Sequence, residues 1–202
     1  MSRPSQSAQD RKQAFHLGGW RDLVEKLQFE IDEFDRTRLV DAEPRWRTFR
    51  AVNAALTAWH ISDWLWDWVE ECRPELIDRF GAVLNSPLAV HESRRKRATA
   101  FQKAIANRYR PLAMCRTVAT TFKHARSDHY PDPLSTAGVY VLKLVSGTNR
   151  PTGEQWHDLR LFADGKVLNA DEWLKRSAAS WTDFFGRTGL WDVSRGWADE
   201  VE

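Results

Sequence analysis

Apolar residues recur at intervals of three and four through most of this 202-residue chain, the spacing that places them on one face of a helix. The pattern predicts a helix from Trp20 to Arg38 and a long second helix from about Pro44 to Cys72. The second half of that helix is apolar on nearly every side, which is typical of the central helix of a bundle. A short helical turn from Pro74 to Gly81 follows, and prolines introduce a third helix at about 88–109 and a fourth from 111 to 124 or 125.

The hydrophobic period changes after a cluster of Asp and Pro residues at 127–133. Residues 139–145 are β-branched and aromatic, and residues 156–163 alternate between apolar and polar, as strands do. Asp164-Gly165 is a two-residue hairpin signal. We therefore expect a small antiparallel β-meander at about 137–168.

A closing helix is predicted at about 170–185. Asn169 or Asp171 can cap its first turn, and Gly186 is the expected residue at its C-terminal end. The predicted fold class is mainly α (α+β): a four-helix bundle-like unit followed by a small antiparallel β-meander and a C-terminal helix.

The composition, 42% hydrophobic and 29% charged, is that of a globular domain. We expect one helical domain at 16–190, preceded by a flexible tail at 1–15 and followed by a second tail at 191–202.

Several classes of protein are disfavoured by what the sequence lacks. No stretch approaches the roughly 18 apolar residues of a membrane span, and the first fifteen residues lack the apolar core of a signal peptide. Two cysteines, Cys72 and Cys115, are too few for a disulfide framework. There is no glycine-rich phosphate loop, Gly-x-Ser-x-Gly elbow or His-Glu-x-x-His motif. We expect a cytoplasmic protein that forms a homodimer and has no membrane partner and no cofactor.

Charge is distributed unevenly, although the net charge is only +2. Residues 61–80 carry six acids against two arginines, whereas residues 91–126 carry ten Lys or Arg against a single acid. Clustered cations on a helix are typical of proteins that bind the phosphate backbone of RNA or DNA. The residues predicted to contact nucleic acid are Arg94, Arg95, Lys96, Arg97, Lys103, Arg108, Arg110 and Lys123. The alternatives are a solvated helix face, or a homodimer in which this basic region pairs with the acidic helix of a second copy.

The second helix carries polar residues and a tryptophan on one narrow face: Asn53, Thr57, His60, Trp64 and Asp67. Asp63 lies at the edge of this face. Because the rest of the helix is apolar, we expect the face to point into the bundle interior or a cleft. It would be either a structural network, with His60 bonded to Asp63 or Asp67, or part of a functional site, since a histidine beside carboxylates has a tunable proton affinity.

The fourth helix has a matching polar face, with Arg116, Thr120 and Lys123 at helical spacing and His124 beside them. If the two helices are neighbours, one cleft would hold five of these polar residues: His60, Asp63, Arg116, Lys123 and His124. Such a group suits phosphodiester chemistry, with histidine as general acid or base and the cations holding the phosphate. It would serve equally as a binding site without catalysis.

Two segments, TAWHISDWLW at 57–66 and CRTVATTFKH at 115–124, resemble paired signatures of a family of uncharacterised bacterial proteins. In that family an AWH-x-x-DW helix precedes a CR-(x)n-KH helix, short strands and a hairpin, here FADGKVLNADEWL. The resemblance covers about residues 45–185 and implies no known activity.

The arrangement also resembles, more distantly, the HEPN helical domains, many of which are metal-independent ribonucleases of toxin–antitoxin and phage-defence systems that act as dimers. The resemblance implies that Arg116 holds the phosphate and His124 acts as acid or base. The family motif has four to six residues between these two positions, whereas seven separate them here, and Lys123 stands at the longest family spacing.

The function predicted from the sequence is binding of nucleic acid or nucleotide, with HEPN-like RNA cleavage as one form of it. One alternative is a non-catalytic interaction subunit, such as an antitoxin or adaptor, that binds a protein partner through exposed tryptophans; Trp191 and Trp197 are the best candidates. A second alternative is a metal-binding bundle using His60, Asp63, Asp67, His124 and His129. Surrounding cations and the absence of a His-x-x-x-His pair disfavour it, so no metal is expected.

Overall fold

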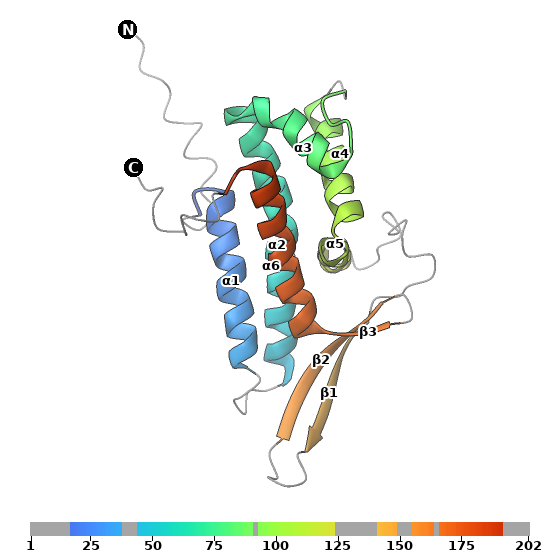
Figure 1. The fold of residues 1–202 in the computed structure, drawn as a ribbon. Coiled ribbons are helices and arrows are strands. Elements are labelled where there is room, and N and C mark those ends of the chain that lie inside the picture. Colours follow the sequence, from blue (N-terminus) through green and yellow to red (C-terminus); the bar gives the residue numbers. More distant parts are fainter. Residues whose placement is uncertain are drawn as a thin grey trace.

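A computed structural model describes residues 17–37, 44–90, 93–123, 141–148, 155–163 and 166–191, and the structural statements below concern these residues. They form six α-helices and a three-stranded antiparallel sheet (Figure 1). The helices are α1 (Trp20–Arg36), α2 (Pro44–Cys72), α3 (Ile77–Leu84), α4 (Arg94–Arg108), α5 (Arg110–Lys123) and α6 (Ala170–Thr188), with a 3-10 turn at Pro74–Leu76 before α3. The strands are β1 (Val141–Thr148), β2 (Gln155–Ala163) and β3 (Lys166–Asn169), in the order β1-β2-β3. The predicted fold class is confirmed.

Helix α2 is the centre of the helical unit, as its sequence predicts. It contacts α1, α4, α5 and α6, and it runs beside α1 and α6 through most of its length (Figure 1). Ala54, Ala55 and Ala58 are fully buried, and their small side chains let neighbouring helices approach closely. The indole Nε1 of Trp181 in α6 donates to the carbonyl of Ala58 at 2.8 Å, which joins the last helix to the central one.

Aromatic rings fill the space where α2, α3, α4 and α6 meet. Trp66 stacks on Phe101 with ring centroids 5.1 Å apart, and Phe80 packs edge to face on Phe184 at 4.9 Å. All four side chains are at most 1% exposed. The tryptophan-rich second half of α2 is therefore mainly core, because Trp66 is buried and Trp64 and Trp68 are partly buried against it.

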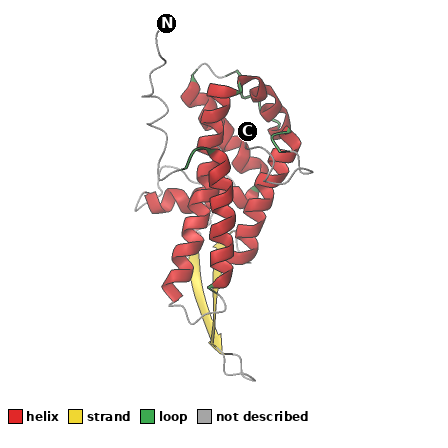
Figure 2. Ribbon diagram, turned by 90° about the vertical axis from the view of Figure 1, so that its left-hand side faces the viewer, coloured by secondary structure: helices red, strands yellow, loops and turns green. Residues whose placement is uncertain are grey.

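The sheet lies at one end of the helical unit (Figure 2). Its pairing is that of a meander, with Val141 opposite Phe162 in the first hairpin and Leu161 opposite Leu168 in the second. Leu159 of β2 is fully buried, so the sheet contributes to the same core.

The predicted end of the last helix at Gly186 is wrong. Helix α6 continues to Thr188, which is fully buried and donates from its hydroxyl to the carbonyl of Phe184 at 2.8 Å. Gly189 then adopts φ +66°, the left-handed conformation that ends the helix. The predicted cap at the other end is confirmed, because the side chain of Asn169 accepts from the backbone N–H of Asp171 at 3.0 Å.

Helix α3 also runs further than its glycine predicts, to Leu84, and Asn85 ends it with φ 51°. Gly81 lies inside the helix, where a Cβ would be 2.7 Å from the carbonyl oxygen of Ser86. The glycine is needed because the chain folds back on α3 at this point. Helix α4 begins at Arg94, later than expected, with Ser93 as its N-cap.

Trp191 was a candidate for an interface in the C-terminal tail, but it is partly buried, and its ring stacks on Phe185 at 6.1 Å. Trp197, the predicted tail at 1–15 and residues 192–202 of the predicted tail at 191–202 lie outside the described residues. No helix in the described ranges is both long enough and apolar enough to cross a membrane.

Candidate nucleic-acid interface

Helix α4 carries its cations on two different faces. Arg94 and Arg97 point to the acidic second half of α2, while Phe101 and Ile105 on the same side are fully buried. Arg97 Nε lies 2.6 Å from Glu70 Oε1, and the guanidinium of Arg94 lies 2.7 Å from Asp67, 3.2 Å from Glu71 and 3.3 Å from Glu70. The acidic and basic blocks of the sequence therefore neutralise each other partly within one chain.

These ion pairs explain part of the charge pattern by contacts within one chain. A second copy is not needed to explain why an acidic helix and a basic helix occur together, because α2 and α4 contact each other directly. The pairs also hold Arg94 and Arg97 against carboxylates, so neither guanidinium is offered to a phosphate in this arrangement.

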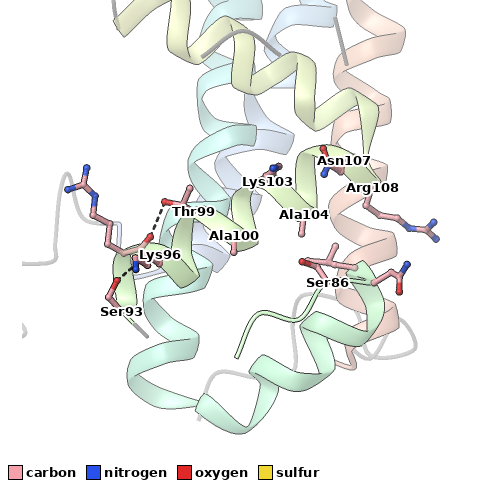
Figure 3. A pocket seen from close by; sticks show the side chains of 12 residues that line it. Ser86, Ser93, Lys96, Thr99, Ala100, Lys103, Ala104, Asn107 and Arg108 are labelled. Atoms are coloured by element: carbon pink, nitrogen blue, oxygen red, sulfur yellow. Dashed lines mark hydrogen bonds between the residues drawn. The ribbon is translucent and has the colours of Figure 1, made fainter. Parts of the chain in front are cut away.

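The other face of α4 borders an open groove with a volume of about 1060 Å³ (Figure 3). Its lining comes from α4 and from the turn that follows α3: Leu84, Asn85, Ser86, Ser93, Arg95, Lys96, Thr99, Ala100, Lys103, Ala104, Asn107 and Arg108. Four of these described lining residues are cationic, and none is Asp, Glu, His, Cys or aromatic. The groove is thus a surface of one charge sign with small hydroxyl and amide groups between the cations.

The helical period sets the spacing of these cations. Lys96 and Lys103 are seven residues apart, so they project from nearly the same side of α4, separated by about 10 Å along its axis. Arg95 and Arg108 lie at the two ends of the groove, about 20 Å apart on the same measure. Figure 3 shows Ala100 and Ala104 on the side of α4 that faces the turn with Ser86.

Local interactions fix both walls of the groove. Ser93 caps α4 by accepting from the N–H of Lys96 at 3.3 Å, and Thr99 donates to the carbonyl of Arg95 at 2.9 Å. On the other wall, the N–H of Ser86 donates to the carbonyl of Gly81 at 2.9 Å. The cations themselves are exposed, and within the described ranges no carboxylate forms an ion pair with Arg95, Lys96 or Lys103.

A polar cluster lies close enough to Arg108 to be affected by its charge. The hydroxyl of Tyr109 donates to Asp183 Oδ2 at 2.8 Å, and Arg187 pairs with the same carboxylate at 2.8 Å. Burial, together with the bond to Asp183, raises the pKa of Tyr109 to about 12. The hydrogen bond from Arg187 lowers the pKa of Asp183, and Arg108 acts electrostatically in the same direction. This carboxylate is therefore ionised and already engaged, beside the groove.

The polar face of α2 does not point into the bundle interior, so the first of the two placements predicted for it is wrong. Asn53, His60, Asp63 and Asp67 are exposed, and only Thr57 is buried, where its hydroxyl accepts from Lys26 Nζ of α1 at 2.6 Å. Asp63 accepts a hydrogen bond from Gln102 of α4. The packing follows the cost of desolvation, because α2 turns its apolar sides to its neighbours and leaves His60, Asp63 and Asp67 in contact with water.

Helices α2 and α5 are neighbours, as the predicted cleft requires. Cys115, Val118 and Ala119 pack inward, and the guanidinium of Arg116 lies over the ring of Trp59, 5.6 Å from its centroid. The side chain of Lys123 and all of His124 lie outside the described residues, so the cleft with His60 and Asp63 stays a prediction.

Two further predicted contacts have clear positions. Arg110 is half-buried at the start of α5 and is not among the residues that line the groove. For a metal, no group of three or more His, Cys, Asp or Glu within the described part of the chain is placed to hold an ion. His124 and His129 of that hypothesis lie outside it.

The uncharged groups that line the groove were not among the residues predicted from the sequence. Thr99 and Asn107 share a face of α4 with Lys96 and Lys103, and a helical wheel of this segment would have shown it. Asn85 and Ser86 belong to a different element, and no spacing along the chain indicates that they face α4.

Comparison of the chain with protein-family models, with curated proteins and with solved structures gave no significant match.

Proposed function

We propose that this protein binds nucleic acid along the α4 groove, through contacts to the phosphate backbone. The observation that carries the proposal is the composition of the described groove lining, which has four cations and no carboxylate. Each phosphate that such a cation neutralises releases a condensed counterion, which is the main source of sequence-independent affinity for nucleic acid.

The length of the array favours a polymer over a single phosphate or a mononucleotide. Lys96 and Lys103 are about 10 Å apart along the helix, and the outer arginines, Arg95 and Arg108, about 20 Å, so one phosphate group cannot reach all of them. Ser86, Thr99 and other uncharged polar groups stand between the cations, and such groups commonly donate to phosphate and sugar oxygens.

The proposal is for binding, and catalysis is not part of it. The described lining has no His, Asp, Glu or Cys to act as a general acid, base or nucleophile. HEPN-like cleavage by Arg116 and His124 remains a separate hypothesis, for which a nuclease assay of wild type against His124→Ala in the presence of chelator is the direct test.

The experiment that tests the proposal compares two double variants in a fluorescence anisotropy titration with labelled DNA and RNA. Lys96→Ala/Lys103→Ala removes two groove cations. Arg36→Ala/Arg176→Ala removes the same charge from α1 and α6, where the side chains are 74% and 65% exposed, and serves as the matched control.

Four phosphate contacts predict a slope of about −3.6 in a plot of log affinity against log salt, which is about 150-fold weaker binding at 200 mM than at 50 mM. The groove variant should lose about half of that slope and at least tenfold in affinity at 50 mM salt, while the control stays within threefold of wild type. Equal losses in both variants, or no binding by wild type at 50 mM, would overturn the proposal.

A second candidate, an interaction subunit, is favoured by one observation. Trp46 and Phe49 at the start of α2 are each 51% exposed, and their rings pack edge to face with centroids 5.8 Å apart. Trp and Phe are enriched at protein–protein interfaces relative to the rest of the protein surface. Sedimentation velocity of wild type and Trp46→Ser/Phe49→Ser tests whether this pair joins two copies: a wild-type dimer that the variant loses supports it, and a wild-type monomer at 100 μM contradicts it.

A further inference from the structure

We infer that the ligand of the α4 groove is a double-stranded nucleic acid, bound in preference to a single strand. The inference rests on the proposed function and deepens it, because it names the form of nucleic acid that the groove fits. It follows from what the described lining of the groove lacks, from how firmly the helix that carries the cations is packed and from the spacing of the cations along it.

The described lining of the groove contains no aromatic side chain. Proteins that bind single strands combine a basic track with aromatic rings on which the unpaired bases stack, and much of their affinity comes from that stacking. Tyr109 is the aromatic residue adjacent to Arg108 in the chain, but it is only 8% exposed, and its hydroxyl is bonded to Asp183. An unpaired base that entered the groove would meet Ala100, Ala104 and polar groups in place of a ring.

The cations are carried by a helix that is held firmly in place. Phe101 and Ile105 are fully buried beneath α4, and Arg97 is paired with Glu70 of α2 on the same side. The positions from which the groove cations project are therefore set before any ligand binds. A pre-set array suits a ligand whose phosphates are also fixed in space, because neither partner then loses much conformational freedom on binding. A flexible single strand would have to be ordered to match it.

The spacing of the two lysines agrees with the phosphate spacing of a duplex. B-form DNA rises 3.4 Å for each phosphate of one strand, so the roughly 10 Å between Lys96 and Lys103, which project from nearly the same side of α4, equals about three phosphate steps. Contacts of this kind go to phosphate and sugar and carry no sequence information. We therefore expect duplexes of unrelated sequence to bind within about threefold of one another.

The test uses the full chain and four labelled probes at 50 mM salt: a 20-base-pair DNA duplex, an RNA duplex of the same sequence, and unstructured 20-mers of dT and of U. The expected result is at least tenfold tighter binding of one or both duplexes than of either single strand. The two duplex arms show whether the B-form or the A-form backbone fits. Lys96→Ala/Lys103→Ala should weaken duplex binding at least tenfold and single-strand binding less than threefold.

The inference and the proposed function fail in different ways. Equal or tighter binding of the single strands, with the loss still confined to the groove variant, overturns the duplex preference and leaves the groove as a nucleic-acid site. Binding of none of the four probes, or the same loss in Arg36→Ala/Arg176→Ala, overturns the proposed function. Both substituted lysines are exposed, so matching circular dichroism spectra and melting temperatures are expected for all three proteins.

Discussion

Removal of Arg97 is expected to destabilise the fold while leaving nucleic-acid binding nearly unchanged. The side chain of Glu70 is only 7% exposed, and it lies between Arg97 Nε at 2.6 Å and Arg94 Nε at 3.3 Å. Arg97→Ala takes away the closer of its two partners. In the structure Arg97 pairs with α2, whereas Lys96 and Lys103 line the groove. Arg97 should therefore stabilise the fold, and the two lysines should bind the ligand.

The size of the effect follows from the burial of the carboxylate. Leaving a buried charge without its partner costs about 3–5 kcal/mol. Arg97 is itself 27% exposed and Arg94 remains beside Glu70, so Arg97→Ala should lower the free energy of unfolding by about 1–2 kcal/mol. The double variant Arg94→Ala/Arg97→Ala should lose about 3–4 kcal/mol. Glu70→Gln in the Arg94→Ala/Arg97→Ala background should recover about 1 kcal/mol, because it removes the charge that has lost both arginines.

Urea denaturation followed by circular dichroism measures these differences as shifts in the midpoint at constant slope. Duplex binding by the same proteins, in buffer without urea, should stay within threefold of wild type. The reasoning would be refuted if Arg94→Ala/Arg97→Ala were as stable as wild type and had lost as much affinity for duplex as Lys96→Ala/Lys103→Ala.

Three further predictions concern other parts of the described chain. Cys72 is exposed, whereas Cys115 is fully buried, and burial raises the pKa of Cys115 to about 12. Iodoacetamide at pH 8 should therefore label one thiol per chain quickly and the second only after denaturation. Two thiols that react equally fast, as followed by mass spectrometry, would contradict this. Burial, with a hydrogen bond to a carboxylate, raises the pKa of Tyr109 from 10 to about 12, so the stability it contributes is present below pH 10 and is lost between pH 10 and about 12. The difference in melting temperature between wild type and Tyr109→Phe should therefore shrink from pH 9 to pH 11, and a constant difference would refute the assignment. Gly81→Ala places a methyl group 2.7 Å from the carbonyl oxygen of Ser86, so it should lower the free energy of unfolding, measured by urea denaturation, by about 1–3 kcal/mol. A stability equal to wild type would show that the turn is not tightly packed on α3.

The sequence was most informative where a periodic pattern continued for many residues. Hydrophobic spacing located α1, α2, α4, α5 and α6 and the three strands to within a few residues at most of their ends. Local backbone preferences were less reliable at the glycines: both predicted ends at a glycine, Gly81 and Gly186, lie inside helices. The apolar faces of α3 and α6 continue past them, and burial of Leu84 and Thr188 outweighs the helix-breaking tendency of one glycine.

The order of charged residues in the sequence indicated an acidic block and a basic block, but it did not indicate which charged side chains form ion pairs. Arg94, Arg95, Lys96 and Arg97 are consecutive in the sequence and look equivalent there. Successive residues of a helix are rotated by 100°, and α2 covers one side of α4. Arg94 and Arg97 therefore face carboxylates of α2, whereas Arg95 and Lys96 face the groove. The same packing excludes the interior placement predicted for the polar face of α2, which lies exposed because the core is built from the apolar sides of that helix.

The sequence by itself determined the elements, the central position of α2 and the excess of cations on the segment that becomes α4, because these depend on periodicity and composition within short stretches of chain. Only the tertiary structure decided which cations are paired, that Asn85 and Ser86 line the same groove as Lys96 and Lys103, and that His60 and Asp63 face water. Those outcomes depend on how helices far apart in the sequence are oriented around a shared core, and that orientation is set by the summed burial of many apolar side chains and not by any local motif.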